Sequence, residues 1–405
     1  MNILLAHNYY GSAAPSGENR VFETEINLLR QRGHKVSVII RRSDVIRAKG
    51  AMGAIHGALA TPWNVFAARD IRRMVEADSP EVVHAHNTFP LLSPAIFHAV
   101  GRRAARVLTL HNYRLFCPAA LPMRAGHVCT ECMDRHSVIP AIRYGCYRGS
   151  RIATMPLATS IALHRHLGTW TNQVDAFIAM SEFQREKMIA AGLPADLVHV
   201  KPNFYPGDPS VVPWAARRPS AVFVGRLSAE KGVLALVRAW MMWGASAPEL
   251  RIVGEGDLRG ELEQLAASSA EVPIRFLGQL ADEAARDEIA NAKLLVLPSE
   301  CFEGFPMVVQ EAFALGTPVA VSNIGPLPSI VQPGKNGVIF EPGAPRSLLA
   351  AVRTVWEQAG ELENLAAGAR RSFETLYTED VNYRMLMTIY GQAMEVSQRR
   401  RNAVR

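Results

Sequence analysis

The chain has 405 residues, 49% of them hydrophobic and 20% charged, and its formal net charge is +7. This is the composition of an ordinary globular protein with a sizeable core, and the length favours about two domains. No run of about 18 uncharged apolar residues occurs, which excludes a membrane-spanning helix, and the opening residues lack the layout of a signal peptide. We therefore expect a cytoplasmic protein.

The positive charge is concentrated in the first half of the chain. All twelve histidines lie there, the last being His199, and basic residues outnumber acidic ones up to Gly207. Such an uneven distribution suggests a surface that meets an anion, which could be a membrane surface, an acceptor carrying a phosphate, or nucleic acid. The arginines are scattered singly or in pairs and accompany no nucleic-acid motif, which disfavours the last of these. A basic surface that is merely solvated is an equal alternative.

In chain order, the first half alternates short apolar runs with segments of helical period. The expected strands are 2–6, 35–40, 81–86, 106–111, 175–181 and 197–203. The expected helices are 18–32, 65–77, 93–104 and 182–191. Short continuous apolar strands between helices imply a parallel sheet that is covered on both faces.

The alternation restarts after a proline-rich segment, 203–219, which is expected to be the linker. The expected strands are 220–225, 250–254, 274–278, 292–298 and 317–322. The expected helices are 231–243, 257–269, 346–358, 361–376 and 379–397. We predict two doubly wound α/β domains, 1–205 and 206–378, and a C-terminal helix and tail, 379–405, that packs back on the first domain. Two such sheets facing each other would place their carboxyl-end crevices around a central cleft.

The stretch "SECFEGFPMVVQEAFALGTPV", residues 299–319, joins an expected strand to an expected helix. Glu303 lies in the loop, Pro306 is expected to be the first helical residue, and Glu311 falls inside the helix. A helix N-terminus attracts anions whereas carboxylates repel them, so the ligand should combine negative charge with hydroxyl groups. A phosphate joined to sugars satisfies both requirements.

Two other strand ends in the second half carry glycines and basic residues. "VFVGRLSAEKG" offers Gly225, Arg226 and Lys231, and "RIVGEGD" offers Gly254, where the backbone can approach a ligand closely. Neither G-x-G-x-x-G nor a Walker loop is present, which disfavours a nicotinamide enzyme or an NTPase. All these residues fall at carboxyl ends of strands in one domain, and this convergence predicts one anion site.

The order "GRL…KG", "VGEG", "EGF" followed by "EA", and then "GTPV" resembles the retaining glycosyltransferases of family four, which have the GT-B fold of two Rossmann-like domains. The resemblance implies that Arg226 and Lys231 hold the donor diphosphate and that Glu311 binds the ribose hydroxyls. It implies that Glu303 contacts the transferred sugar and its phosphate, and that no cofactor is needed for catalysis. The implied donor-binding residues are Gly17, Gly225, Arg226, Lys231, Gly254, Glu303, Gly304, Phe305 and Glu311.

The first half also carries features of this family. "SGENRVFETEINLLRQRGHKVSV" (16–38) resembles the opening helix, with the single Gly17 where many members have two glycines. The expected strands in "VVHAHN" and "TLHNYR" bring a histidine to the cleft. The family places the second near the donor sugar and acceptor, so His111 is the expected active-site histidine and His86 is assigned to the acceptor side. For each, a structural hydrogen-bonding role is the alternative. The expected catalytic set is His111, Glu303, Arg226 and Lys231.

Four of the five cysteines crowd into the irregular stretch before residue 150. They are Cys117, Cys129, Cys132 and Cys146. A C-x-x-C pair flanked by two further cysteines has the character of a tetrahedral structural zinc site, which would order a long loop. Four reduced thiols in a packed loop are an equal alternative.

The sequence thus predicts a retaining, hexosyltransferase-type glycosyltransferase acting in polysaccharide or glycoconjugate synthesis. Its partners would be a nucleotide-diphosphate sugar, a saccharide or lipid-linked acceptor, and an anionic membrane touched weakly by the first domain from the inner face. Segment 41–63, which mixes basic and apolar residues, is the expected contact. One alternative is a nucleotide-sugar epimerase of the same fold. Another is a zinc-stabilised nucleic-acid-binding protein, which would leave Glu303 and Glu311 unexplained.

Overall fold

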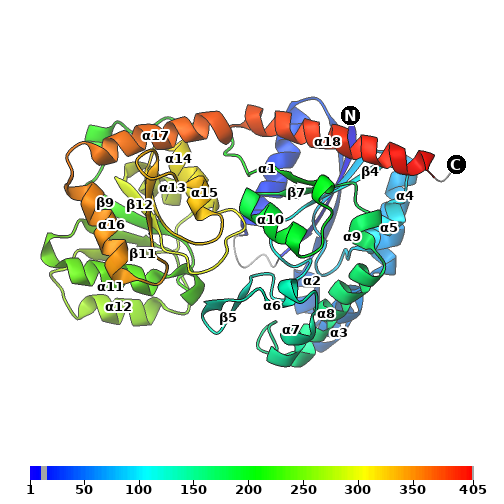
Figure 1. Cartoon of the computed structure of the whole chain (residues 1–405), viewed down its shortest axis with the longest axis horizontal. Coiled ribbons are helices and arrows are strands. Elements are labelled where there is room, and N and C mark those ends of the chain that lie inside the picture. The colour runs from blue at the N-terminus through cyan, green and yellow to red at the C-terminus, as the bar shows by residue number, and fades with distance from the viewer. Residues whose placement is uncertain (11–15, 404–405) are drawn as a thin grey trace. The chain divides into compact units, whose positions relative to one another are not determined.

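The computed structural model describes residues 1–10 and 16–403, and it divides into two compact α/β units. The first unit consists of Met1–Pro122, Cys129–Pro202 and Asn382–Arg405. The second consists of Met123–Val128 and Asn203–Val381. Figure 1 traces the chain through both units and labels the elements named below.

The first unit is built on a six-stranded parallel sheet with the order β2-β1-β3-β4-β7-β8. The chain moves outward from β1 to β2, returns to β3 on the other side of β1, and continues outward from there, so the sheet is doubly wound. The strands are β1 Asn2–Tyr9, β2 Lys35–Arg42, β3 Val82–Asn87, β4 Ala105–Thr109, β7 Ala176–Ala179 and β8 Val198–Val200. The helices are α1 Gly17–Gln31, α2 Asp44–Ala48, α3 Gly50–Ala60, α4 Val65–Asp78, α5 Ala95–Val100, α6 Glu131–Asp134, α7 Ile139–Tyr144, α8 Arg151–His166, α9 Thr169–Asn172 and α10 Glu182–Ala190.

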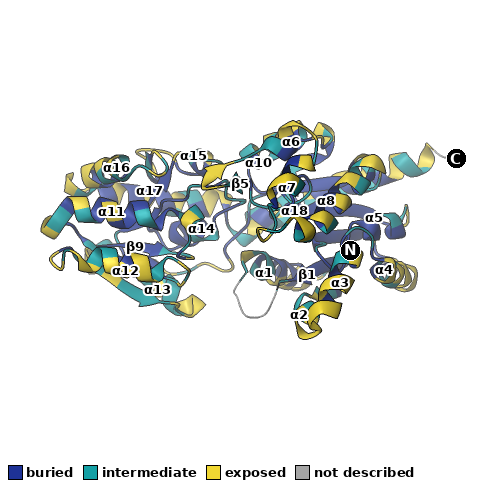
Figure 2. Ribbon diagram, turned by 90° about the horizontal axis from the view of Figure 1, so that it is seen from below, coloured by how far each residue is buried: buried dark blue, intermediate teal, exposed yellow. Residues whose placement is uncertain are grey.

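Apolar residues at helical spacing explain how α1 covers this sheet. Phe22, Ile26 and Leu29 fall on one face of the helix and are buried. They share a core with Ile3 and Leu5 of the central strand β1. Figure 2 colours each residue by its burial and shows the strands in dark blue, as buried, and the outer faces of the helices in yellow, as exposed. The burial of α1 therefore fixes its N-terminus at the edge where the strands end.

The C-terminal helix α18, Glu379–Asn402, completes the core of the first unit. Its apolar side is buried in the same cluster as β1 and α1. The residues that α18 contributes are Leu386, Ile389, Tyr390 and Ala393. Figure 1 shows α18 in red alongside the first sheet. The last segment of the chain is thus a part of the first unit.

The second unit has its own six-stranded parallel sheet with the order β11-β10-β9-β12-β13-β14. The strands are β9 Ser220–Val224, β10 Glu249–Val253, β11 Ile274–Gly278, β12 Leu294–Leu297, β13 Val319–Ser322 and β14 Gly337–Phe340. The helices are α11 Val233–Trp243, α12 Arg259–Ala267, α13 Asp282–Asn291, α14 Met307–Ala314, α15 Leu327–Ile330, α16 Pro345–Glu357 and α17 Glu361–Leu376. A core centred on Phe223, Leu236 and Trp240 joins this sheet to its helices. A short hairpin, β5 Met123–Arg124 and β6 His127–Val128, also belongs to this unit.

The doubly wound α/β class predicted from the sequence is confirmed, while several details differ. The helix expected at 93–104 is only α5, since Gly101 adopts a positive φ of 58°. Helices α2, α3, α8 and α13 and strand β14 were not expected, and helix α18 continues to Asn402. The units change at Pro202 and Val381, where the sequence suggested 205 and 378. Within the described residues, no helix is long and apolar enough to cross a membrane.

Candidate active site

In the second unit, the loops that follow β9, β10 and β12 meet at one edge of the sheet. These strands are parallel neighbours in the order β10-β9-β12, so their carboxyl ends lie together. The loop after β9 carries Arg226 and Lys231, the loop after β10 carries Gly254, and the loop after β12 carries Glu303. The structure therefore brings these sequence-derived donor residues to a single edge.

Lys231 and Glu303 form an ion pair at this edge. Nζ of Lys231 donates a hydrogen bond to Oε1 of Glu303 at 2.7 Å, and Oγ of Ser299 donates to the same oxygen at 2.6 Å. Burial opposes ionisation of Glu303, but the attraction of Lys231 and the two hydrogen bonds outweigh it, so the pKa of the carboxyl is lowered. Burial likewise disfavours the charged form of Lys231, yet Glu303 raises the pKa of the ammonium above its ordinary value. Both groups are therefore charged near neutral pH.

The glycines of this edge permit close contact between loops. A Cβ on Gly254 would lie 1.9 Å from the carbonyl oxygen of Gly225, and a Cβ on Gly232 would lie 1.8 Å from that of Pro298. Both glycines also have positive φ, +140° and +66°. The sequence suggested that Gly254 admits a ligand. In the structure, the carbonyl group of Gly225 in the neighbouring loop already occupies the space that a side chain at Gly254 would need.

Arg226 and helix α14 complete this edge of the sheet. The side chain of Arg226 is 70% exposed, and its Nη1 lies 3.9 Å from Oε1 of Glu230. Its charge therefore remains accessible to a ligand. Helix α14 begins after Pro306, which has extended backbone angles, and not at Pro306 as expected. Glu311 lies inside α14 and is buried, while Gly304 and the buried Phe305 belong to the loop that precedes it.

The first unit has a cavity of about 60 Å³ beside the ends of β3 and β4. His86 and Asn87 reach it from β3, and His111 and Asn112 reach it from the loop after β4. Because β3 and β4 are parallel neighbours, residues at their carboxyl ends converge. The guanidinium of Arg114, which also lines the cavity, lies 4.1 Å from the centre of the Phe89 ring. The cavity thus offers hydrogen-bonding groups and a positive charge above an apolar wall.

Both histidines expected from the sequence line this cavity, and they contact each other. Nδ1 of His86 lies 3.1 Å from Nε2 of His111, with the two rings stacked. Burial, reinforced by neighbouring histidines, lowers the pKa of His111 well below its ordinary value. Gly17 is the first residue of α1 and is exposed. Residues 11–15 lie outside the described part of the chain.

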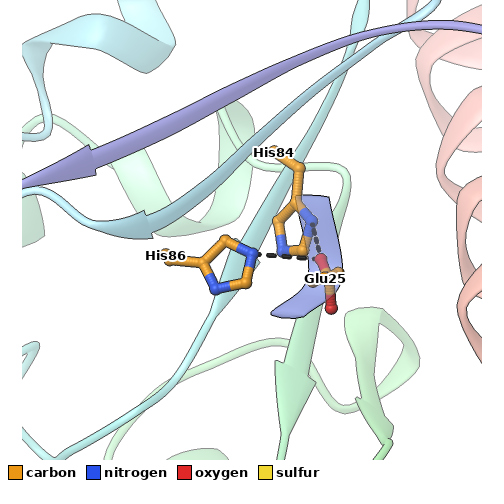
Figure 3. Close-up of side chains that lie close together, drawn as sticks. All are labelled: Glu25, His84 and His86. Carbon is orange, nitrogen blue, oxygen red and sulfur yellow. Dashed lines mark hydrogen bonds and ion pairs between the residues drawn. The ribbon is translucent and has the colours of Figure 1, made fainter. Parts of the chain in front are cut away.

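A buried carboxylate, Glu25, stands behind the two histidines. Its Oε1 lies 3.0 Å from Nε2 of His86 and 3.2 Å from Nδ1 of His84, and its Oε2 accepts a hydrogen bond from Nζ of Lys201 at 3.2 Å. Figure 3 shows both imidazole rings turned toward the Glu25 carboxylate. Burial opposes ionisation of Glu25, but Lys201 and the histidines hold its pKa well below the ordinary value. The cluster therefore contains a buried carboxylate.

Glu25, His84 and His86 place their ligand atoms within 4.8 Å of one another, as a metal site would. Two features argue against a cation there. The Lys201 ammonium already neutralises the carboxylate and would repel a metal ion. Moreover, His84 is engaged by the hydroxyl of Tyr390 at 2.8 Å through Nδ1 and by that of Thr109 at 2.7 Å through Nε2. The arrangement fits a hydrogen-bonded charge cluster better than a metal centre.

Sequence reasoning missed Glu25, Lys201 and Arg114. The signal for Glu25 was present, since it lies between Phe22 and Ile26 on the apolar face of α1, where a charge requires a partner. The partner could not be identified, because Lys201 lies 176 positions away along the chain. Arg114 follows His111 in "TLHNYR" and carried no distinguishing pattern.

The four clustered cysteines are close to one another but do not form a metal-ligand set. The described part of the chain has a single group of three ligand atoms within 4.8 Å, and it contains none of these thiols. A tetrahedral zinc site would need sulfur atoms about 3.8 Å apart, as Zn–S bonds of about 2.3 Å dictate. Burial raises the pKa of Cys117 to about 12 and also raises that of Cys132, with neighbouring cysteines adding to both shifts. The zinc site stays a prediction.

The chain matches two known families over most of its length. Residues 15–206 match Glycosyltransferase Family 4, and residues 208–372 match Glycosyl transferases group 1. The chain belongs to the family-four glycosyltransferases. A putative teichuronic acid biosynthesis glycosyltransferase of Bacillus subtilis is 25% identical over 87% of this chain and 88% of its own length.

Other curated relatives of this family-four chain match a smaller part. An uncharacterized glycosyltransferase of Methanocaldococcus jannaschii is 32% identical over 43% of this chain and 45% of its own. A glycogen synthase of Mycobacterium tuberculosis is 33% identical over 46% of each chain. The matched stretches thus span less than half of these relatives.

Solved structures establish the GT-B fold. A glycosyltransferase from Rickettsia africae superimposes with a TM-score of 0.68 over 97% of this chain and 99% of its own, at 14% identity. Anabaena HepE, solved in complex with UDP and glucose, superimposes with a TM-score of 0.64 over 96% of this chain and 100% of its own, at 18% identity. This agrees with the two doubly wound units of the family-four chain.

Proposed function

We propose that this chain is a retaining hexosyltransferase that takes its sugar from a nucleoside-diphosphate donor. The observation that carries the proposal is the Lys231–Glu303 ion pair at one edge of the second sheet. The loop after β9 that supplies Lys231 also carries Arg226, and the loop that supplies Glu303 leads into α14. Two cations neutralise charge that develops on a leaving diphosphate, and a fixed carboxylate accepts hydrogen bonds from sugar hydroxyls. The complex of Anabaena HepE with UDP and glucose supports a donor of this kind.

Each donor-side residue receives a role in this proposal. Arg226 and Lys231 bind the diphosphate, Glu303 and the backbone of Gly304 and Phe305 bind the transferred sugar, and Glu311 binds the ribose. No side chain is assigned as a covalent nucleophile. Retention would then follow from attack on the face that the leaving phosphate occupied, with that phosphate accepting the acceptor's proton. No cofactor is required for this chemistry.

The experiment that tests the proposal is a panel of nucleotide sugars. The full chain is incubated with UDP-, GDP-, ADP- and TDP-linked hexoses, with and without saccharide acceptors, and nucleotide release is measured. Acceptor-dependent release from one donor, with an α-linked donor giving an α-linked product, is expected. Conversion of the donor sugar to its epimer without transfer would instead identify a nucleotide-sugar epimerase, while stabilisation by a short oligonucleotide alone would favour nucleic-acid binding.

We further propose that the acceptor is a lipid-linked saccharide reached from the inner face of a membrane. Helix α3 supports this proposal, since Met52, Ile55 and Leu59 are 76%, 61% and 73% exposed. These residues follow Arg47 and Lys49, and such a mixture binds anionic interfaces through apolar burial and roughly 1 kcal/mol per basic residue. Arg41 contributes less than the sequence suggested, because it is paired with Asp70.

Vesicle co-sedimentation tests the membrane contact. Wild-type chain is expected to bind vesicles containing phosphatidylglycerol and not vesicles of phosphatidylcholine alone, and moderate salt should release it. Met52→Ser with Ile55→Ser, and separately Arg47→Glu with Lys49→Glu, should abolish binding. The matched control is Met242→Ser with Leu376→Ser, which removes two half-exposed apolar side chains from the second unit. Equal binding to both kinds of vesicle would refute the contact.

A further inference from the structure

The cluster around Glu25 has a defined hydrogen-bond direction. A carboxylate can only accept hydrogen bonds, so each side chain that hydrogen-bonds to it must donate. Three side chains lie close to Glu25, namely Lys201, His86 and His84, whose Nδ1 is 3.2 Å from Oε1. Nζ of Lys201 donates to Oε2 at 3.2 Å, and Nε2 of His86 therefore carries a proton that it donates to Oε1 at 3.0 Å. The charge on Glu25 thus decides which nitrogen of His86 is protonated.

The same logic extends from His86 to His111. With a single proton, on Nε2, His86 would have only a lone pair at Nδ1, and Nε2 of His111 would then donate across the 3.1 Å contact. Burial and the surrounding histidines keep His111 neutral near pH 7, and a neutral imidazole has a single proton. Nδ1 of His111 is then an unprotonated acceptor.

We propose that Lys201, Glu25 and His86 are positioning residues that fix the tautomer of His111, so that His111 offers a bare Nδ1 to a hydroxyl group of the bound sugar. The proposal rests on the function proposed above, because the hydroxyl belongs to a transferred or accepting sugar. His111 lines the cavity of the first unit, and its other ring nitrogen is occupied by His86. A hydrogen-bond acceptor that is partly buried, neutral and held in one tautomer discriminates in favour of a hydroxyl donor.

Groups from every element packed around the cluster hold this arrangement. Lys201 also donates to Oδ1 of Asn382 at 3.0 Å, and Nδ2 of Asn382 donates to the carbonyl oxygen of Pro202 at 2.6 Å. Tyr390 binds His84 from the same helix, α18. The titratable groups facing the cluster are His7 on β1, Glu25 on α1, His84 and His86 on β3, His111 after β4, Lys201 after β8 and Tyr390 on α18. The C-terminal helix therefore helps to position the Lys201 ammonium, which in turn orients the Glu25 carboxylate.

The tautomer can be measured directly by NMR on the full chain with nitrogen-15-labelled histidine. Near pH 7, we expect the His111 proton on Nε2 and a lone pair on Nδ1, with His111→Gln used to assign the signal. If His86 were instead charged, its Nδ1 would donate and the His111 proton would sit on Nδ1. A wild-type His111 protonated on Nδ1 would overturn the proposal. This measurement requires no turnover, so it can fail while the proposed function stands.

Glu25→Gln gives the proposal a sharper test. The amide oxygen should remain with Lys201, which can only donate, so the amide nitrogen would face Nε2 of His86 and donate to it. His86 would then be protonated on Nδ1 and would donate to His111, moving the His111 proton to Nδ1. We expect this reversed tautomer in the spectrum and a fall in kcat of about tenfold, the worth of one hydrogen bond.

The matched control is Asp175→Asn, which weakens another buried ion pair in the same sheet. Asp175 accepts from Nε of Arg106 at 2.9 Å and contacts neither histidine of the cavity. It should lower stability without altering the His111 tautomer. If Glu25→Gln left the tautomer unchanged, or if Asp175→Asn altered it equally, Glu25 would have no specific positioning role.

Discussion

Nζ of Lys231 lies 2.7 Å from Oε1 of Glu303, although the two residues are 72 positions apart and come from the loops after β9 and β12. The sequence assigned them to different parts of the donor, the diphosphate and the sugar. Because they are paired and mostly buried, removing either one changes the charge state around the other. Their mutational effects should therefore be coupled and not additive.

The first prediction concerns this coupling. Lys231→Ala should lower kcat by about 10²-fold, as the loss of one charge-stabilising group does, and should leave the Glu303 carboxylate unpaired beside the donor phosphates. Adding Glu303→Gln should then partly restore donor affinity, since the uncompensated negative charge is gone. Steady-state kinetics on the two single variants and the double variant measure this. Strictly additive effects would contradict the pairing, and Lys293→Ala serves as a surface lysine control in the same unit.

Arg226→Ala should separate activity from stability. The side chain is 70% exposed, so its removal should shift the free energy of unfolding by no more than about 0.5 kcal/mol. Its charge is expected to act on the departing diphosphate, so kcat should fall by about 10²-fold. Thermal unfolding and turnover on the same preparation decide the matter. Near-wild-type turnover would remove Arg226 from the diphosphate site.

Glu311 and Glu303 should differ in what they bind. Ribose contacts are made equally in the ground and transition states, so Glu311→Ala should mainly weaken binding of the nucleotide. Glu303→Ala should mainly slow transfer, because the proposed contacts of Glu303 are to the reacting sugar. Calorimetry with UDP alone, or with the nucleoside diphosphate that the donor panel selects, measures the nucleotide affinity of each variant. Equal losses of nucleotide affinity would show that the roles are wrongly divided.

The fold could be predicted because it depends on local patterns. Short apolar strands such as β9 and β12 alternate with helices along the whole chain, and each alternation can be read within about 15 residues. The unexpected helix α8 has Pro156 in its interior, which obscures its helical period. The cluster around Glu25 was hidden for a different reason. Tyr390 contacts His84 across 306 positions, and no local pattern reports such a pairing.

Acid should destabilise the first unit through its buried neutral histidines. Burial lowers the pKa of His164 to about 4, against an ordinary value of 6.5. The unfolded chain therefore binds more protons than the folded chain below about pH 6.5, and this contribution to stability is lost as pH falls from about 6.5 through about 4. Chemical denaturation at a series of pH values should show the loss, to which His84, with a pKa of about 4, also contributes.

His164→Gln should flatten this pH dependence. In the wild type, Nε2 of His164 lies 2.8 Å from the carbonyl oxygen of Pro62. The amide nitrogen of glutamine can donate a hydrogen bond to the same oxygen, but it does not titrate. The stability of this variant should depend less on pH between about 6.5 and 4, while its activity near pH 7 is preserved, since His164 lies outside the cavity that His86 and His111 line. A slope equal to that of the wild type would mean that His164 is not neutral in the folded chain.

The last prediction concerns zinc at Cys117, Cys129, Cys132 and Cys146. Purified chain is expected to carry about one zinc, as four thiolates of this spacing would bind. The raised pKa of Cys117, about 12, means that metal binding must release protons, so zinc affinity should fall steeply as the pH is lowered. Cys129→Ser with Cys132→Ser should lose the metal and stability, whereas Cys301→Ser, which removes the separate cysteine of the second unit, should retain zinc. Metal analysis that finds no zinc after growth in zinc-supplemented medium would show that the four thiols only pack the loop. Among the described residues, no three ligand atoms within 4.8 Å of one another include a cysteine sulfur.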